Sequence, residues 1–208
     1  DLTPAEAQDV LATFVDAGKL PRYRVGQILN RLWTLPATGF AAMTELPAEL
    51  RTRLAEQFEL PRLTIAADER SSDGTRKFLF RLTDGQAIET VAIPDGNRLT
   101  LCVSSQAGCA LRCAFCATGA MGFARQLTPH EIAGQVRELA LLDPPVLATN
   151  VVFMGMGEPM MNWTAVDTAL TILNSPAGFN IGARHITVST VGVLPGINAL
   201  AGRPEQFR

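Results

Sequence analysis

The sequence predicts an α/β protein built from three consecutive parts. Apolar residues recur at helical spacing in residues 1–60, short alternating strands separated by turn signals fill residues 61–101, and strands alternate with helices from residue 102 onward. Alternation of this last kind produces right-handed βαβ units and a parallel sheet. We therefore expect a small helical domain (1–60), a short antiparallel β segment (61–101) and the first part of a larger β/α domain (102–208).

Residues 1–60 carry start and stop signals for three helices. Thr3 is a candidate N-cap followed by proline and an acidic first turn, and Gly18 is a candidate C-cap. A second helix should begin near Tyr23, and Leu46-Pro-Ala-Glu-Leu should open a third.

Basic residues gather around the second predicted helix, namely Lys19, Arg22, Arg24 and Arg31. A solvated charged face and an RNA-contacting face explain this cluster equally well on the sequence alone.

Four short strands are expected in the second part. Their residues alternate or carry β-branched and aromatic side chains, and Asp-Gly turn signals separate them. The expected strands are 63–67, 76–82, 87–93 and 99–103.

The third part alternates between strands and helices. Thr128-Pro-His-Glu predicts a capped helix, 150–154 a buried strand, and 185–191 a further strand, with helices expected between and after the strands. Functional groups in such folds lie in the loops at the carboxyl ends of the strands. The residues after 101, the Gly155-Met-Gly-Glu-Pro loop and Ser189 all fall at such ends.

Three of the four cysteines stand within eight residues, as Cys109-Ala-Leu-Arg-Cys113-Ala-Phe-Cys116. Three thiolates on one loop suit a soft metal or an iron–sulfur cluster with one open iron. Zinc needs a fourth ligand, which Cys102 or His130 could supply, although the usual spacing of zinc modules is absent. A disulfide framework is disfavoured because only 4 of 208 residues are cysteine. The spacing favours a cluster and leaves zinc as the alternative.

The spacing C-x3-C-x2-C with Phe115 before the last cysteine resembles the signature of radical S-adenosylmethionine (SAM) enzymes. The run Thr100-Leu-Cys-Val-Ser-Ser-Gln-Ala-Gly-Cys-Ala-Leu-Arg-Cys-Ala-Phe-Cys-Ala-Thr-Gly resembles the RlmN/Cfr branch of that superfamily. The resemblance implies a [4Fe–4S] cluster on Cys109, Cys113 and Cys116, with SAM at the open iron. It also implies a partial radical-SAM (β/α) barrel, of which this chain holds about the first three β/α units, and an RNA-contacting role for the helical domain.

Five further residues gain roles only through this resemblance. By themselves, a Gly-x-Gly turn or a serine after a strand is usually part of a turn, a free cysteine behaves as a small apolar residue, and one acid in a strand faces solvent. The resemblance implies SAM contacts for Gly157, Glu158 and Ser189. It implies that Glu89 accepts a proton, and that Cys102 resolves a covalent RNA–protein intermediate and then forms a disulfide with a second cysteine.

The implied activity is methylation of adenosine C2 in the peptidyl-transferase region of 23S ribosomal RNA, or in transfer RNA, through a methyl-cysteine intermediate. An aromatic ring carbon is a poor nucleophile, and cofactor radical chemistry overcomes that difficulty. Methylation at C8, as in the resistance branch, is the near alternative. A non-enzymatic RNA-binding module stabilised by zinc or a cluster is the distant alternative.

The formal charge of −2 argues against a protein that coats nucleic acid non-specifically, but not against an enzyme that takes one extruded base. No run approaches the roughly 18 apolar residues of a membrane helix. We expect a cytoplasmic monomer, an electron donor such as flavodoxin, and no membrane association. The methyl-carrying cysteine of the family has no candidate after Cys116, so we also expect this chain to be a segment of a longer protein that cannot turn over alone.

Overall fold

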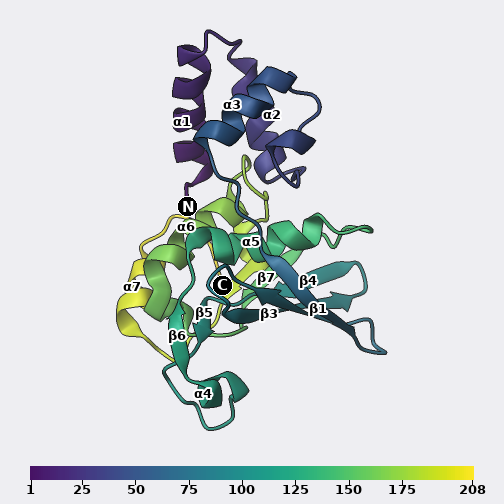
Figure 1. Cartoon of the computed structure of the whole chain (residues 1–208). Helices are drawn as coiled ribbons and strands as arrows, with labels where there is room; N and C mark the ends of the chain where they lie inside the picture. Colours follow the sequence, from purple (N-terminus) through teal and green to yellow (C-terminus); the bar gives the residue numbers. More distant parts are fainter.

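The computed structural model describes all residues from Asp1 to Arg208. Three helices form a separate unit at one end, and the remaining residues form a sheet with helices packed against it (Figure 1). The unit contains α1 (Pro4–Ala17), α2 (Tyr23–Leu32) and α3 (Ala48–Gln57), together with the short 3-10 helix η1 (Phe40–Ala42). All three predicted helices are confirmed.

The first helix shows why the local prediction succeeded. The Thr3 side chain accepts a hydrogen bond from the Glu6 backbone amide, while the Glu6 carboxylate accepts one from the Thr3 amide at 2.8 Å. This capping box satisfies two amides that have no partner within the helix. Gly18 ends the helix as predicted. Behind these caps, α1, α2 and α3 bury one apolar cluster of their own.

Six strands form the main sheet in the order β1-β2-β3-β4-β7-β8. The first four are antiparallel to one another, and the last three are parallel. Their bounds are β1 (Thr64–Arg70), β2 (Arg76–Arg81), β3 (Ala87–Asp95), β4 (Arg98–Cys102), β7 (Asn150–Phe153) and β8 (Ile186–Val188). All six predicted strands are confirmed, although β8 is shorter than the predicted 185–191.

Strand β4 belongs to both halves of the sheet. It pairs antiparallel with β3 and parallel with β7, so the antiparallel strands continue directly into the β/α part. The parallel part therefore begins before residue 102, where the sequence suggests a boundary. The division into three domains remains a prediction. The three parallel strands form an open sheet and not a closed barrel.

Helices cover one face of this sheet. They are α5 (Pro129–Ala140), α6 (Trp163–Asn174) and α7 (Leu194–Ala201), with the 3-10 helices η2 (Pro159–Asn162) and η3 (Ala183–His185) at strand ends. Helix α5 starts with the predicted capping box of Thr128 and Glu131. Its Ile132, Val136 and Leu139 belong to the same buried cluster as residues of α6 and the sheet. We call this side of the sheet the covered face and the opposite side the open face.

A small hairpin was not predicted. Strands β5 (Gln106–Gly108) and β6 (Phe123–Gln126) pair antiparallel on either side of the cysteine loop, which also contains the short helix α4 (Ala117–Met121). Strands of three and four residues are too short to show a clear alternation, so no pattern in these residues predicts the hairpin.

Buried charges attach the helical unit to the core. The Arg137 guanidinium on α5 donates to the carbonyl of Leu32 at 3.1 Å and to that of Ala37. Glu138, also buried, accepts from Arg62 at 2.7 and 2.8 Å. Burial lowers the pKa of Arg137 to about 10, and the adjacent Glu138 carboxylate opposes that shift. Breaking such a buried pair typically costs about 3–5 kcal/mol. These contacts therefore fix the orientation of the helical unit relative to the sheet and its helices.

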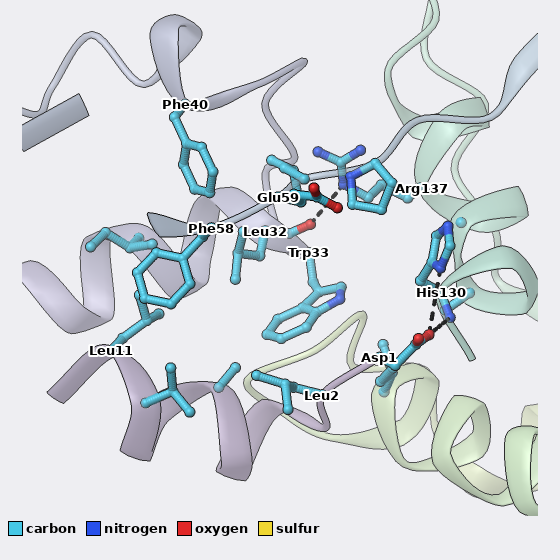
Figure 2. Close-up of a pocket in the computed structure, with 18 of the residues that line it drawn as sticks. Asp1, Leu2, Leu11, Leu32, Trp33, Phe40, Phe58, Glu59, His130 and Arg137 are labelled. Carbon is cyan, nitrogen blue, oxygen red and sulfur yellow. Dashed lines mark hydrogen bonds and ion pairs between the residues drawn. The ribbon is translucent and has the colours of Figure 1, made fainter. Parts of the chain in front are cut away.

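A cavity of about 170 Å³ lies beside Arg137, between the helical unit and α5 (Figure 2). Most of its lining is apolar, with Trp33 and Phe58 on the helical side and His130 and Arg137 on the α5 side. None of the residues to which the family resemblance gives a catalytic, SAM-binding or cluster-binding role lines it, and His130, considered from the sequence as a zinc ligand, lies here away from all four cysteines. No helix has the length and hydrophobicity that crossing a membrane would require.

Candidate active site

The open face of the sheet carries two of the sequence-predicted residues. Cys102 is the last residue of β4, and Val91 of β3 stands directly opposite it. Glu89 lies two residues from Val91 on the same strand, and side chains two apart point to the same face. Strand pairing therefore brings Glu89 and Cys102 onto one face, although thirteen residues separate them in sequence.

Cys102 is half-buried, and all four cysteines are free thiols. Burial raises the pKa of its thiol, and a hydrogen bond with the Met154 backbone opposes part of that shift. The protonated thiol is therefore the form favoured at neutral pH, and proton loss must accompany any nucleophilic attack by Cys102.

Glu89 is partly exposed and ion-paired. Its carboxylate lies 3.4 Å from the Lys77 ammonium on β2, and its backbone carbonyl accepts a 2.6 Å hydrogen bond from the Ser104 hydroxyl. The side chain thus faces the open side, while its main chain is tied to the strand end that leads into the cysteine loop.

Backbone contacts close the cysteine loop. Cys109 donates from its amide to the Gly122 carbonyl at 2.8 Å, which joins the two ends of the loop. Gly108 has a φ of 78°, and a Cβ there would collide with the Gly122 carbonyl oxygen, so only glycine fits. This close approach fixes the point at which the cysteine loop leaves the β5–β6 hairpin.

The three cysteines of the loop are not assembled into one ligand set. No group of three or more His, Cys, Asp or Glu side chains is placed to hold a metal ion. The donor chemistry nevertheless fits a thiophilic group, because all three thiols are free and lie on one loop. A hydrogen bond from the Gly119 backbone lowers the pKa of Cys116, which favours the thiolate that metals bind. Phe115, which lies between Cys113 and Cys116 in the sequence, is 93% exposed.

The Gly155-Met-Gly-Glu loop packs against the segment that leads to the cysteines. The Met156 carbonyl accepts from the amides of Ser105 at 2.8 Å and Gln106 at 3.1 Å. Gly157 has a φ of 100°, and a Cβ there would lie 2.5 Å from the Gln106 Cβ. Glycine is therefore required by both conformation and space, and the structure brings this loop to the start of the cysteine loop.

Glu158 has a buried carboxylate held by two backbone amides. Met160 donates to its Oε1 at 3.0 Å and Val191 donates to its Oε2 at 2.9 Å. The second contact reaches the loop after β8, where Ser189 is exposed two residues earlier. The ends of β7 and β8 are thereby joined, with further acceptor capacity remaining on the carboxylate.

Sequence reasoning missed a buried polar junction below the open face. The Ser104 hydroxyl donates to Glu89 and accepts from the Met156 amide at 2.9 Å. The Gln135 side chain on α5 accepts from the Ser104 amide at 2.8 Å and from the Thr90 hydroxyl at 2.7 Å. Ser104 thus connects the strand of Glu89 to the Gly155 loop. The run Ser-Ser-Gln directly after an apolar strand was the available signal.

The basic cluster of the helical unit is partly neutralised. Arg22 pairs with Asp16 at 2.8 Å, and Arg31 lies 3.4 Å from Glu45. Arg24 donates to the Gln27 side chain at 2.7 Å. These contacts agree with a solvated charged face and reduce the charge available for RNA, so RNA contact by this face stays a prediction.

Comparison with known proteins gives three findings. Residues 103–206 match the Radical SAM superfamily. The chain is 61% identical over its whole length to a protein of Gemmatimonas aurantiaca named "Probable dual-specificity RNA methyltransferase RlmN", and 41% identical to a protein of the same name from Akkermansia muciniphila. It covers 58% and 60% of these two relatives.

A solved structure is similar over the whole chain as well. The crystal structure of a radical SAM methyltransferase from Sphaerobacter thermophilus matches with a TM-score of 0.88 and 44% identity, covering 100% of this chain and 61% of that protein. The chain therefore spans about three fifths of the length of the proteins it matches.

Proposed function

The chain belongs to the radical SAM superfamily, and we propose that it is the cluster-binding portion of a methyltransferase that modifies adenosine C2 in 23S ribosomal RNA and transfer RNA. The observation that carries the proposal is the convergence of Glu89 and Cys102 on the open face, with Cys102 at the end of the strand that precedes the loop of three free cysteines. The whole-length similarity to proteins named RlmN supports it.

Cys109, Cys113 and Cys116 would hold a [4Fe–4S] cluster and leave one iron for SAM. When bound, the cluster and SAM supply a carbon radical, which can attack a ring carbon that ordinary methyl transfer does not reach. The strands β4, β7 and β8 with their helices would form about the first three β/α units of the barrel around it.

The loops at the ends of β7 and β8 would hold SAM. Gly157 gives a backbone without a side chain at this point, while Glu158 and the Ser189 hydroxyl provide polar contacts. Because two amides orient the Glu158 carboxylate, its free lone pairs would meet the SAM ammonium in a fixed direction.

Glu89 and Cys102 would complete the reaction on the base. Addition of the carbon radical leaves one unpaired electron on the ring, which the adduct would give up to the cluster. A Glu89 oxygen would then take the proton from the substituted ring carbon, and the electron pair of the broken C–H bond stays in the ring. Cys102 loses its proton, and its sulfur bonds to the sulfur of the methyl-carrying cysteine, which lies outside this chain. The C–S bond to the base breaks with its electrons on carbon, and that carbon takes a proton to become the methyl group.

The partners follow from the same proposal. An RNA substrate would reach the open face with the target base extruded, and the helical unit would contact the surrounding RNA. A reduced protein such as flavodoxin would deliver electrons to the cluster. A monomeric enzyme in the cytoplasm would have access to both the RNA substrate and the electron donor.

A turnover experiment on the full-length protein tests the proposal. The reconstituted protein is incubated anaerobically with SAM, a reductant and unmodified 23S rRNA fragment or tRNA, and the nucleosides are analysed by mass spectrometry. We expect 2-methyladenosine in both RNAs. Formation of 8-methyladenosine would favour the resistance-type activity, and absence of methylation with zinc bound would favour the RNA-binding module.

A variant isolates the role of Cys102. Cys102→Ala should leave the covalent RNA–protein intermediate unresolved, so a slow-migrating band should accumulate on a denaturing gel. Ser71→Ala, in the exposed turn before β2, is the matched control and should turn over normally. Normal turnover by Cys102→Ala would remove Cys102 from the mechanism.

A further inference from the structure

A single row of paired residues crosses the open face from β2 to β8. Lys77 pairs with Val91, Val91 with Cys102, Cys102 with Val152, and Val152 with Thr187. Paired residues in neighbouring strands point to the same face. Lys77 therefore shares the face and the row of Cys102, although 25 residues separate them in sequence.

Lys77 lies between two carboxylates on neighbouring strands. Its Nζ is 3.3 Å from Glu69 Oε2 on β1 and 3.4 Å from Glu89 Oε1 on β3. The hydrogen bond to Glu69 and then the charge of Glu89 raise the pKa of Lys77, so the amine remains an ammonium. The cation thus has a second partner when the charge on one of them changes.

Stability alone does not account for this arrangement. The side chains of Lys77 and Glu89 are each 45% exposed, and exposed ion pairs contribute about 0–1 kcal/mol. The geometric consequence is larger, because a diagonal contact across two strands limits the rotamers of Glu89 on the face that carries Cys102. The Ser104 hydrogen bond fixes the main chain of Glu89, and Lys77 fixes its side chain.

We infer that Lys77 is a positioning residue for Glu89, holding its carboxylate toward the base that reacts beside Cys102. This inference rests on the proposed function, in which Glu89 takes the proton of the methylated ring carbon. When that proton arrives, the Glu89 carboxylate becomes neutral and the electron pair stays in the base. Lys77 keeps its proton and its pair with Glu69, so no unpaired charge is created.

A double-mutant cycle on the full-length holoenzyme tests the inference. Single-turnover methylation is measured for Lys77→Met, Glu89→Gln and the double variant, and the covalent RNA–protein intermediate is quantified on denaturing gels. A well-placed base contributes about 10²–10⁴-fold, and we expect loss of its positioning partner to slow turnover roughly tenfold. The intermediate should accumulate in Lys77→Met, and the substitution should have no further effect in the Glu89→Gln background.

Two variants serve as controls. Lys77→Arg keeps the cation and should restore most of the rate. Arg81→Met removes an exposed cation from the same face of β2, four residues along, and should turn over as the unmodified enzyme does.

The possible results separate this inference from the proposed function. A normal rate for Lys77→Met beside a slow Glu89→Gln overturns the role of Lys77 and leaves the proposed function standing. An equal effect of Lys77→Met in both backgrounds, or a change only in the KM for RNA, also overturns it by indicating direct RNA contact. A normal rate for Glu89→Gln removes Glu89 as the base and overturns both assignments together.

Discussion

The two faces of the six-stranded sheet are built from the same strands but differ in burial and in the side chains they carry. On the covered face, Phe80, Ile88 and Leu101 are fully buried under α5 and α6. Their immediate neighbours Glu89 and Cys102 face the open side and keep partial exposure. Because strand side chains alternate between faces, one segment can both form the core and present reactive groups. Substitutions at two adjacent residues of one strand should therefore affect different properties. The one on the covered face should lower the stability, and the one on the open face should alter the reactivity.

The largest effect of a substitution should occur in the cysteine loop, which follows the strand that ends at Cys102. Cys113→Ala in the full-length protein removes one of the three proposed ligands, so iron and sulfide content should fall to background after reconstitution, with an unchanged far-ultraviolet circular dichroism spectrum. Cys102→Ala is the control and should keep its full cluster content. Cluster loss in Cys102→Ala, with retention in Cys113→Ala, would show that Cys102 is a ligand.

Adjacent residues of β4 give the next comparison. Leu101→Ala on the covered face should lower the free energy of unfolding by about 2–5 kcal/mol, because it leaves a cavity in the core. Cys102→Ala on the open face should lower it by less than about 1 kcal/mol, as expected outside the packed core. Urea denaturation of the full-length protein measures both. Equal losses would mean that the open face is also a packed core.

The Cys102 thiol provides a test through pH. Burial places its pKa above the ordinary 9.0 in the folded state. The alkylation rate with iodoacetamide should therefore still be rising at pH 9 in the folded, cluster-loaded protein, whereas in the urea-unfolded protein it should level off at a lower pH. By linkage, this thiol contributes stability below pH 9 that is lost as the pH rises through the raised pKa. Peptide mass spectrometry follows Cys102 alone. Identical pH profiles in both states would contradict the burial of this thiol.

The smallest effect is expected at a helix cap behind the covered face. Thr128→Ala removes the cap of α5 and should cost about 0.5–2 kcal/mol of stability, seen as a lower melting temperature. Cluster content and the reactivity of Cys102 should stay unchanged, because the cap lies away from the open face. Thr128→Ser retains the hydroxyl and should restore stability. A loss well above this range would indicate that the cap also supports the ion pair between Arg125 and the buried Glu131 carboxylate.

Many residues of the candidate site could be proposed from the sequence, but the side chains that support and connect them could not. The cysteine spacing, the Gly155-Met-Gly-Glu loop and Ser189 were identified from the residues themselves and the family resemblance. Ser104, Gln135 and Lys77 were not, because a serine, a glutamine or an exposed lysine has no distinctive pattern in sequence. The hairpin β5–β6 was missed because its strands are very short.

Elements whose signals lie within a few residues of one another could be predicted without the structure. The capping boxes of Thr3 and Thr128 and the alternation of the strands are local, so they predicted the six strands of the main sheet and every α-helix except the short α4. Strand pairing in the folded protein shows that β4 joins both halves of the sheet and that Lys77, Glu89 and Cys102 share one face. Those facts depend on register between distant segments. A shift of one residue would move each side chain to the other face, and buried contacts of the whole sheet fix the register.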